Sequence, residues 1–371
     1  MKILITGAQG FVGRNLVAQL KNEGYQDIDT FTLDNTVDEL KASLAKADFI
    51  FHLAGVNRPK NKADFYSGNS DLTKKITDTL IRTKHAVPIL MSSSIQAALD
   101  NDYGKSKHQA ELAVLDYGTQ LKVPVYVYRL KNLFGKWSRP NYNSVTATFA
   151  YNLSHDLPIK INDANAELEL SYIDDVIASF IDTMKNGYQF TSDSQFCNVP
   201  ISYNVTLGKL AGKLKAFHDS RKTLIMPSLR SQFDRDLYAT YLSYLDKDNF
   251  SYKLKKNEDD RGWLAEFIKS KDNGQIFVST TKPGITRGNH WHHTKVEKFL
   301  VVQGEGLIEF RQIDGQEVLK YQVSGDHPEV VDIPAGYIHN ISNIGTEKMV
   351  TIFWACEIFD PENPDTYYEG V

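Results

Sequence analysis

The sequence predicts two domains of different fold class: a doubly wound α/β domain with a parallel sheet over residues 1–245, and an all-β domain over residues 246–371. The length of 371 residues is enough for two domains at about 150 residues each. Short apolar runs alternate with segments of helical spacing in the first part of the chain. Short strand-like segments separated by Gly and Pro fill the second part.

The α/β domain is expected to begin with a buried parallel strand at residues 2–6, because its centre is apolar. A glycine turn follows, and residues 11–22 then carry apolar side chains at helical spacing. Further strands are expected at residues 30–33, 49–53, 87–91 and 125–128, and further helices at residues 71–83 and 106–117. This alternation is typical of a doubly wound parallel sheet.

The all-β domain follows a charged stretch. Residues 246–249 and 253–261 are charged and poor in large apolar side chains, so we place the linker near them. Short strands are expected at residues 275–280, 297–302, 307–310, 330–333 and 349–354. Short strands broken by turns are typical of an antiparallel sandwich or barrel.

Charge and composition narrow the partners and the location. The net charge is -4 and the chain has no long basic run, so nucleic acid is not expected as a partner. Cys197 and Cys356 match no zinc or redox spacing and fit a reducing compartment. No apolar run approaches the ~20 residues that span a bilayer, and the first residues form no signal peptide. We therefore expect a cytoplasmic enzyme without a membrane span.

Gly7, Gly10 and Gly13 follow the first strand and open the first helix, which is the context of a dinucleotide-binding loop. Glycine lets the backbone turn tightly and approach a pyrophosphate, and the helix N-terminus supplies N–H groups and a positive dipole end. We expect cofactor contacts at Gly7, Gly10, Phe11, Val12, Gly13 and Arg14.

Tyr103 and Lys107 are four residues apart and therefore share one face of a helix. We expect the lysine ammonium to favour the phenolate and so to lower the pKa of the Tyr103 phenol. Such a tyrosine can pass a proton to or from a carbonyl oxygen as a hydride arrives. The pair therefore predicts hydride-transfer chemistry.

Four motifs together resemble the extended short-chain dehydrogenase/reductases, a family that acts on nucleotide sugars. They are Thr-Gly-Ala-Gln-Gly-Phe-Val-Gly at residues 6–13, His-Leu-Ala-Gly at 52–55, the serine run at 92–94, and Tyr-Gly-Lys-Ser-Lys at 103–107. The segments 129–135 and 172–176 resemble later motifs of the family. The resemblance covers roughly residues 1–240 and implies a Rossmann-type domain.

The resemblance also implies roles for individual residues. Ser94 would complete a catalytic set with Tyr103 and Lys107. Additional cofactor contacts are implied at Leu53, Ala54, Gly55, Asn69, Tyr103 and Lys107. Substrate contacts are implied at Ser94, Asn132 and Arg139.

Two residues give opposite indications about the cofactor. Asp34 closes the second strand, where an acidic side chain would bind the ribose hydroxyls of NAD. Arg14 directly follows the glycine motif and could instead meet the 2′-phosphate of NADP. On these residues alone, the choice between NADH and NADPH stays open.

His290, His292, Glu297 and His339 form a metal-ligand pattern in the all-β domain. His290 and His292 alternate along a strand and so point to one face, and the other two could converge from neighbouring strands. Three imidazoles and one carboxylate suit a divalent metal such as zinc. The full pattern resembles the two motifs of the cupins, a family of double-stranded β-helix barrels, except that Pro328 stands in place of a glycine.

The same region resembles the sugar-nucleotide 3,5-epimerases, a cupin group that typically works without metal, at residues 260–262, 266 and 287–290. In that group the histidine at the position of His290 is a general base beside a ketone. A metal-bound His290 cannot also be a free base, so a metal would be structural or would polarise the ketone. In the second case another group must move the proton, and the candidates are His293, Lys298 and Tyr337.

Over its whole length the chain resembles bifunctional enzymes of capsular polysaccharide synthesis that join a dehydrogenase/reductase to a metal cupin. The resemblance implies that the cupin domain epimerises C3 of a UDP-2-acetamido-2,6-dideoxy-4-hexulose. The first domain would then reduce C4 with NADPH to UDP-N-acetyl-6-deoxy-L-talosamine, on the route to UDP-N-acetyl-L-fucosamine. Because cupins often dimerise through strands, a homodimer is expected.

Two alternatives stay open at this point. One is a 4,6-dehydratase or 4-epimerase, which uses the same first domain but recycles tightly bound NAD. The other is a noncatalytic cupin that binds sugar or drives dimerisation. Net consumption of NADPH separates a reductase from the first alternative.

Overall fold

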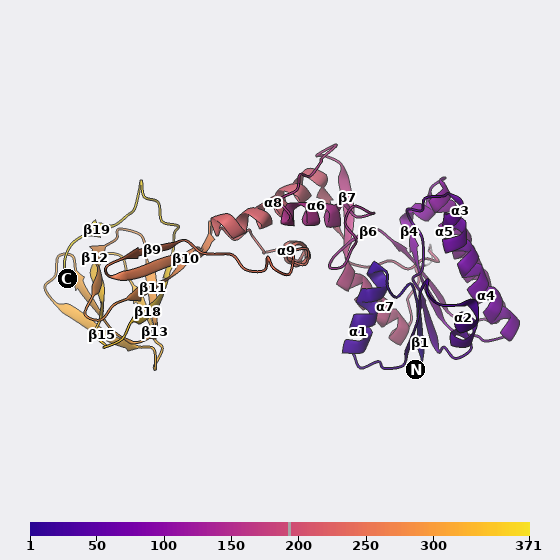
Figure 1. Ribbon diagram of the computed structural model, residues 1–371, viewed down its shortest axis with the longest axis horizontal. Coiled ribbons are helices and arrows are strands. Elements are labelled where there is room, and N and C mark those ends of the chain that lie inside the picture. Colours follow the sequence, from indigo (N-terminus) through magenta and orange to yellow (C-terminus); the bar gives the residue numbers. More distant parts are fainter. Residues whose placement is uncertain (192–193) are drawn as a thin grey trace. The chain divides into compact units, whose positions relative to one another are not determined.

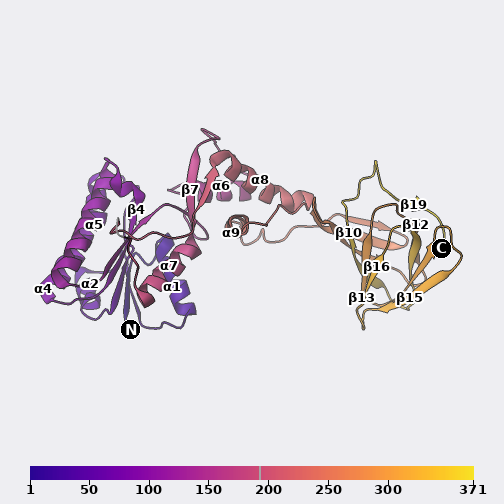
Figure 2. The same ribbon diagram turned by 180° about the vertical axis from the view of Figure 1, so that it is seen from behind.

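The structure is a computed structural model that describes residues 1–191 and 194–371. The chain divides into an N-terminal unit, Met1–Leu214 with Leu229–Leu245, and a C-terminal unit, Lys215–Ser228 with Asp246–Val371. Figure 1 shows the elements of both units, and Figure 2 shows them from behind. The segment Lys215–Ser228, which the sequence analysis placed in the first domain, is grouped with the second unit by its contacts.

The N-terminal unit contains a parallel sheet in the order β2-β1-β3-β4-β5. Every neighbouring pair runs parallel, which confirms the doubly wound α/β class. β1 and β3 lie side by side, so the strand order reverses between them, and folds of this class bind their ligands at such a point. The strands are β1 (Ile3–Thr6), β2 (Ile28–Phe31), β3 (Phe49–His52), β4 (Ile89–Ser94) and β5 (Val125–Leu130).

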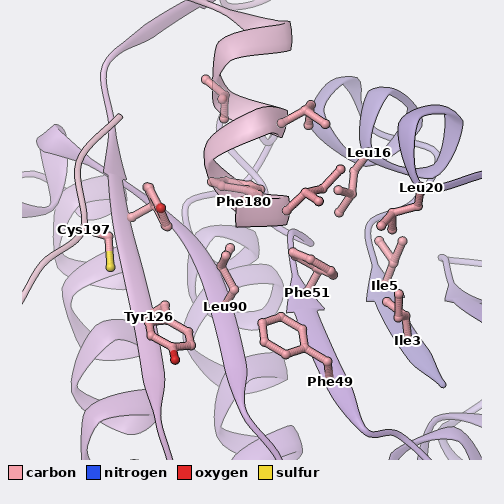
Figure 3. Packing of buried hydrophobic residues seen from close by; sticks show 14 of the residues in the cluster. Ile3, Ile5, Leu16, Leu20, Phe49, Phe51, Leu90, Tyr126, Phe180 and Cys197 are labelled. Carbon is pink, nitrogen blue, oxygen red and sulfur yellow. The ribbon is translucent and has the colours of Figure 1, made fainter. Parts of the chain in front are cut away.

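Helices cover both faces of this sheet because strand side chains alternate. Ile5 of β1 belongs to one apolar cluster and Leu4 to the other. On the first face Phe180 stacks on Phe51, with ring centroids 6.4 Å apart (Figure 3). Two helices pack on that face, α1 (Phe11–Asn22) and α7 (Ile173–Asn186). Three helices pack on the other face, α2 (Val37–Leu44), α4 (Leu72–Thr83) and α5 (Asp102–Leu121).

Helix α5 begins at Asp102, before the predicted start at residue 106. The side-chain oxygen of Asn101 accepts a hydrogen bond from the Gly104 N–H at 2.8 Å and caps the helix there. Tyr103 and Lys107 therefore both lie on α5, in its first turns.

Further elements extend the unit beyond what the sequence predicted, including a three-stranded sheet in the order β6-β7-β8. The remaining elements are α3 (Ala63–Phe65), the π-helix η1 (Tyr66–Asp71), the 3-10 helix η2 (Ile95–Ala98), β6 (Asn132–Phe134), α6 (Val145–Ser154), β7 (Glu167–Tyr172), β8 (Tyr203–Thr206), α9 (Gln232–Leu242) and α8 (Leu207–Thr223), whose residues from Lys215 onward are grouped with the C-terminal unit. Within the described ranges, none of the helices combines the length and apolar character needed to cross a membrane.

The C-terminal unit consists of two antiparallel sheets, in the orders β16-β13-β18-β11-β10-β9 and β15-β14-β17-β12-β19. This arrangement confirms the all-β, cupin-type class. Apolar side chains from the two sheets, among them Phe299, Ile308 and Phe353, form its core. The strands are β9 (Lys256–Asp259), β10 (Gly262–Ser270), β11 (Gly274–Thr281), β12 (Thr286–Trp291), β13 (Glu297–Gln303), β14 (Glu305–Gln312), β15 (Val318–Ser324), β16 (Val330–Ile333), β17 (Tyr337–Asn343), β18 (Met349–Ala355) and β19 (Tyr367–Tyr368).

Part of the charged stretch interpreted as linker is a strand, so the linker interpretation is wrong for Lys256–Asp259. These residues form β9, which pairs with β10 at the edge of its sheet. All four side chains are exposed. Charged side chains on an edge strand discourage pairing with other chains, which explains a strand without apolar alternation.

The glycine turn after β1 provides the first test. Gly13→Ala should destabilise the protein by about 1–3 kcal/mol or more, since overpacking has this cost and the new Cβ would lie 2.2 Å from the Gly7 carbonyl oxygen. Gly212→Ala is the matched control, because an added Cβ there meets open space on α8. The control should be neutral or stabilising by up to about 1 kcal/mol. Urea denaturation compares the two, and equal stabilities would contradict the packing argument.

Candidate functional site

The glycine loop packs against the loop that follows β3. Gly7 has φ +71°, and the Gly10 N–H donates to its carbonyl at 2.9 Å. A Cβ on Gly7 would lie 2.7 Å from the Ala54 nitrogen. Only glycine permits this approach, which lies at the point where the strand order reverses. Gly10 is the N-cap of α1, so the glycine loop leads directly into the N-terminus of this helix.

A buried polar chain fixes the same two loops. The side chains of Thr6 and His52 bond at 2.8 Å, and the other ring nitrogen of His52 bonds Thr73 at 2.8 Å. The Ala54 N–H donates to the Thr6 hydroxyl at 3.2 Å. Burial lowers the pKa of His52 to about 3, so this histidine is neutral and has a positioning role.

Asn69 holds the loop after β3 through its whole amide. Its oxygen accepts the Val56 N–H at 2.9 Å, and its nitrogen donates to the Val56 carbonyl at 2.9 Å and to Ser106 Oγ at 3.0 Å. A Cβ on Gly55 would lie 2.9 Å from the Asn69 oxygen and 3.0 Å from Lys107 Nζ. Asn69 was predicted as a cofactor contact, but its amide forms hydrogen bonds with Val56 and Ser106. Through these bonds it holds Gly55 beside Lys107.

The three predicted catalytic residues come together at the carboxyl end of β4. The Ser94 side chain lies close enough to the Tyr103 phenol to lower its pKa, and Lys107 Nζ donates to the Ser92 carbonyl at 3.0 Å. Burial raises the pKa of the Tyr103 phenol, and the effect of Ser94 only partly offsets this. The expected lowering by Lys107 is wrong, because the phenol is buried and the ammonium is bound to the Ser92 carbonyl.

Glu111 is a site residue that the sequence analysis missed. Its buried carboxylate accepts Ser93 Oγ at 2.6 Å and the Arg129 guanidinium in a fork, at 3.0 and 2.7 Å. Burial lowers the pKa of Lys107 to about 8, and the charge of Glu111 opposes this. The four-residue spacing from Lys107 to Glu111 on one helix face was the available signal.

The residues that bear on the choice of cofactor are both exposed. The Arg14 guanidinium lies over the Trp137 ring, 4.8 Å from its centroid. Asp34 lies in the turn after β2, where its N–H donates to Thr32 Oγ1 at 3.4 Å. Arg14 is therefore held beside the first turn of α1 by an aromatic side chain that the sequence analysis did not consider.

The two predicted substrate contacts differ in their surroundings. Asn132 is exposed on β6, and its amide donates to the Glu169 carbonyl at 3.3 Å. The Arg139 guanidinium lies 5.2 Å from the centroid of Tyr142. Tyr142, which no sequence motif marked, is thus the aromatic partner of Arg139.

In the C-terminal unit the four predicted metal ligands converge. One ligand atom from each of His290, His292, Glu297 and His339 lies within 4.8 Å of the others. Glu297 Oε2 lies 3.5 Å from the Nε2 atoms of both His292 and His339. These two Nε2 atoms are buried and have no hydrogen-bond partner in the protein. Buried polar atoms normally have a partner, so this arrangement fits metal ligands. No other such group occurs in residues 1–191 and 194–371.

A β-bulge aims His290 into this cluster. Gly288 pairs with Asn340 and His290 pairs with His339, so Asn289 is the extra residue on β12. Asn289 has φ +58°. A bulge re-aims the side chains beyond it, and a one-residue slip reverses their face. His292 directly follows the end of β12, and its ring joins that of His290 in the cluster, as their alternate spacing predicted.

The cluster is electrostatically prepared for a cation. Burial lowers the pKa of His290 to about 4, and the neighbouring imidazoles of His339 and His292 add to this effect. Burial opposes ionisation of Glu297, but the imidazoles of His292 and His339, whose Nε2 atoms lie 3.5 Å from its Oε2, hold the pKa of its carboxyl at about 2. At neutral pH these two residues are in the deprotonated forms that bind metal.

The three residues predicted as candidates for moving the proton differ in their surroundings. His293 is exposed and its ring lies 4.9 Å from that of Tyr367. Lys298 is exposed and paired with Asp332. Tyr337 lines a cavity of about 370 Å³ together with Phe310 and Asp332. Tyr337 is thus the candidate that lines a cavity.

Two arginines of the epimerase-like motifs also come together. Arg261 Nη2 lies 2.6 Å and Arg287 Nη2 lies 3.9 Å from the carboxylate of Asp259. Burial lowers the pKa of Arg287, and the charge of Arg261 adds to this effect. Two guanidinium groups that share one carboxylate leave a net positive charge on this part of the unit.

The fold and the two residue clusters define the class, an extended short-chain dehydrogenase/reductase joined to a cupin-type domain. Residues 3–194 match the model of the NAD dependent epimerase/dehydratase family, and residues 257–367 match the polysaccharide biosynthesis C-terminal domain. Because the first match spans more than half of the chain, the chain belongs to the NAD dependent epimerase/dehydratase family.

Several proteins are similar to the chain over its whole length. It is 45% identical to the UDP-2-acetamido-2,6-beta-L-arabino-hexul-4-ose reductase of Pseudomonas aeruginosa, over 99% of this chain and 98% of the relative. It is also similar to a crystal structure of the capsular polysaccharide assembling protein CapF from Staphylococcus aureus, with 49% identity, a TM-score of 0.93 and 100% coverage of both chains. A CapF structure with the inhibitor 3-isopropenyl-tropolone matches at 46% identity and a TM-score of 0.89, again with 100% coverage of both chains. The chain is of the CapF type, which confirms the whole-chain resemblance.

The ion pair between Glu111 and Arg129 provides the second test. Glu111→Ala should lower the free energy of unfolding by about 3–5 kcal/mol, because it leaves Arg129 without its carboxylate. Asp116→Ala on the same helix is the control, since Asp116 is exposed and bonds only Gln120 at 2.7 Å, and it should change stability by less than about 0.5 kcal/mol. Urea denaturation followed by circular dichroism measures both. A Glu111→Ala protein as stable as the control would show that the pair does not hold this region together.

Proposed function

We propose that this chain is a bifunctional nucleotide-sugar enzyme of capsular polysaccharide synthesis, with a reductase in residues 1–245 and an epimerase in residues 246–371. The epimerase would invert C3 of a UDP-2-acetamido-2,6-dideoxy-4-hexulose, and the reductase would then convert its C4 ketone to UDP-N-acetyl-6-deoxy-L-talosamine. The observation that carries the proposal is the convergence of Ser94, Tyr103 and Lys107 beside the glycine loop. The 45% identity to a hexul-4-ose reductase supports the same reaction type.

In the reductase, Tyr103 would donate its proton to the C4 oxygen, and Ser94 would hydrogen-bond the same oxygen. Burial raises the pKa of Tyr103, so the phenol is protonated at neutral pH, which is the form that a reduction requires. Lys107 would bind the cofactor ribose and place a positive charge near the phenolate that remains. When bound, NADPH supplies the hydride to C4.

NADPH is our proposed cofactor. The position of Arg14, beside the first turn of α1 and stacked on Trp137, supports a contact with a phosphate group. The remaining proposed cofactor contacts are Gly7, Gly10, Phe11, Val12, Gly13, Asp34, Leu53, Ala54, Gly55, Asn69, Tyr103 and Lys107. For Asn69 we propose an indirect contribution, because its amide is bonded to Val56 and Ser106.

In the epimerase, His290, His292, Glu297 and His339 would hold one divalent metal, zinc by the chemistry of the donor set. Two buried ring nitrogens without protein partners and a carboxylate 3.5 Å from both fit such an ion. When bound, the metal would act as a Lewis acid toward the ketone or support the site structurally. His290 is then occupied as a ligand, and Tyr337 is our proposed group for moving the C3 proton, because it lies two residues before His339 on β17 and residues so spaced share a face of a strand.

Tyr103→Phe tests the proton donor. The variant should reduce the UDP-4-keto sugar about 100-fold to 10,000-fold more slowly, because it lacks the acidic hydrogen while keeping the ring. Oxidation of NADPH measures the reaction, and cofactor fluorescence should show that NADPH still binds. If Tyr103→Phe turned over at the wild-type rate, the assignment of the donor would be wrong.

Deuterium exchange tests the epimerase separately. In D2O without NADPH, the enzyme should introduce deuterium at C3 of the UDP-4-keto-6-deoxy sugar, as read by NMR. His292→Ala removes one proposed ligand and should reduce both the bound zinc and the exchange, while NADPH oxidation with the C3-epimerised sugar persists. An absence of exchange in the wild type, with NADPH still oxidised, would leave a ketoreductase with a noncatalytic C-terminal unit.

A further inference from the structure

The end of the chain lies against the metal-ligand cluster. Residues 364–369, which we call the C-terminal strap, include β19, and this strand pairs with β12 through His290↔Tyr368 and Trp291↔Tyr367 (Figure 1). Tyr367 also stacks on Trp291 with ring centroids 4.6 Å apart. The strap thus runs beside a strand that carries one of the proposed ligands.

The strap determines the hydrogen-bonding state of a second ligand. His292 Nδ1 lies 2.6 Å from the backbone carbonyl oxygen of Asp365. Because a carbonyl can only accept, Nδ1 carries a hydrogen, and in the neutral imidazole that binds a metal Nε2 then carries the lone pair. That Nε2 atom is buried without a partner and lies 3.5 Å from Glu297 Oε2. The lone pair therefore points into the cluster, as metal ligation requires.

The side chain of Asp365 also holds the segment that follows His292. Its carboxylate accepts the backbone N–H groups of His293 at 3.0 Å, Thr294 at 2.9 Å and Lys295 at 3.0 Å, and also the Thr294 hydroxyl at 3.1 Å. Asp365 itself has φ +39°, a left-handed conformation that costs free energy in a residue other than glycine. One side chain thus holds the whole turn between His292 and Glu297.

A buried lysine ties the same turn to the strap a second time. Lys295 is 6% exposed, and its ammonium donates to the Pro364 carbonyl at 2.7 Å and to Thr366 Oγ1 at 3.0 Å. Beyond β19, the Glu369 N–H donates to the Asn289 carbonyl at 3.0 Å. Asn289 is the bulge residue next to His290, so the strap contacts the chain beside both histidine ligands of β12 and its following turn.

We infer that the C-terminal strap positions the metal ligands, and that Asp365 is the positioning residue through which it acts. This inference rests on the proposed metal site. If the strap only covered the edge of the sheet, the strand pairing between β19 and β12 would be sufficient to hold it. The carboxylate bonds to residues 293–295 and the carbonyl bond to His292 are directed at the ligand turn, and they order it before a cation arrives.

The test measures zinc affinity and ligand geometry in the full-length protein. Zinc affinity is obtained by competition with a chromophoric chelator, and the d–d absorption spectrum of the Co²⁺-substituted protein reports the geometry. Asp365→Ala should weaken zinc binding by about 10–100-fold and alter the cobalt spectrum. Asp365→Asn, which keeps one oxygen acceptor, should bind with intermediate affinity and carries the test if the alanine variant does not fold.

Asp360→Ala is the matched control, because Asp360 lies in the same terminal segment but its carboxylate bonds only the neighbouring Glu362 N–H at 3.0 Å and Asn363 side chain at 3.4 Å. It should match the wild type in affinity and spectrum. If both Asp365 variants bound zinc like the wild type, the role of the strap would be refuted while the metal site stood. If the wild type bound neither zinc nor cobalt, the metal site and the strap inference would both fall.

Discussion

The close approach of two backbone loops holds the N-terminal site together. Gly7, at the end of β1, has no room for a Cβ because the Ala54 nitrogen would lie 2.7 Å from it. The loop after β3, which contains Ala54, also contains Gly55, whose missing side chain leaves space for the Asn69 amide and the Lys107 ammonium. The positions that we propose for phosphate binding, ribose binding and proton transfer therefore depend on one packing constraint that glycine alone satisfies. Any shift between β1 and β3 would move all three.

In the C-terminal unit the corresponding constraint is register. His290 stands opposite His339 only because β12 carries one extra residue, Asn289, before it. Without the bulge the imidazole would turn to the other face of the sheet. The cluster is thus assembled by pairing between segments that are far apart in the chain, and the turn that follows β12 completes it with His292 and Glu297.

Both sites share a physical design, in which a group outside the recognisable motif orients a group inside it. The Ser92 carbonyl holds the Lys107 ammonium, and the Asp365 carbonyl holds the His292 ring. Glu111 likewise ties helix α5, which carries Tyr103, to Arg129 of β5. Motif residues supply the reactive atoms, and their neighbours decide tautomer, charge and direction. Tyr103 stays protonated at neutral pH, because burial raises the pKa of its phenol.

The sequence by itself determined the two fold classes, the central strands and the identity of both clusters, because apolar periodicity and side-chain chemistry are local properties. It also determined that Tyr103 and Lys107 share a face, since helical spacing suffices. Only the tertiary structure decided the edge strand β9, the bulge at Asn289, the direction of the Tyr103 pKa shift and the contact between Asp365 and His292. These depend on burial and on pairing between distant segments, which no local pattern encodes.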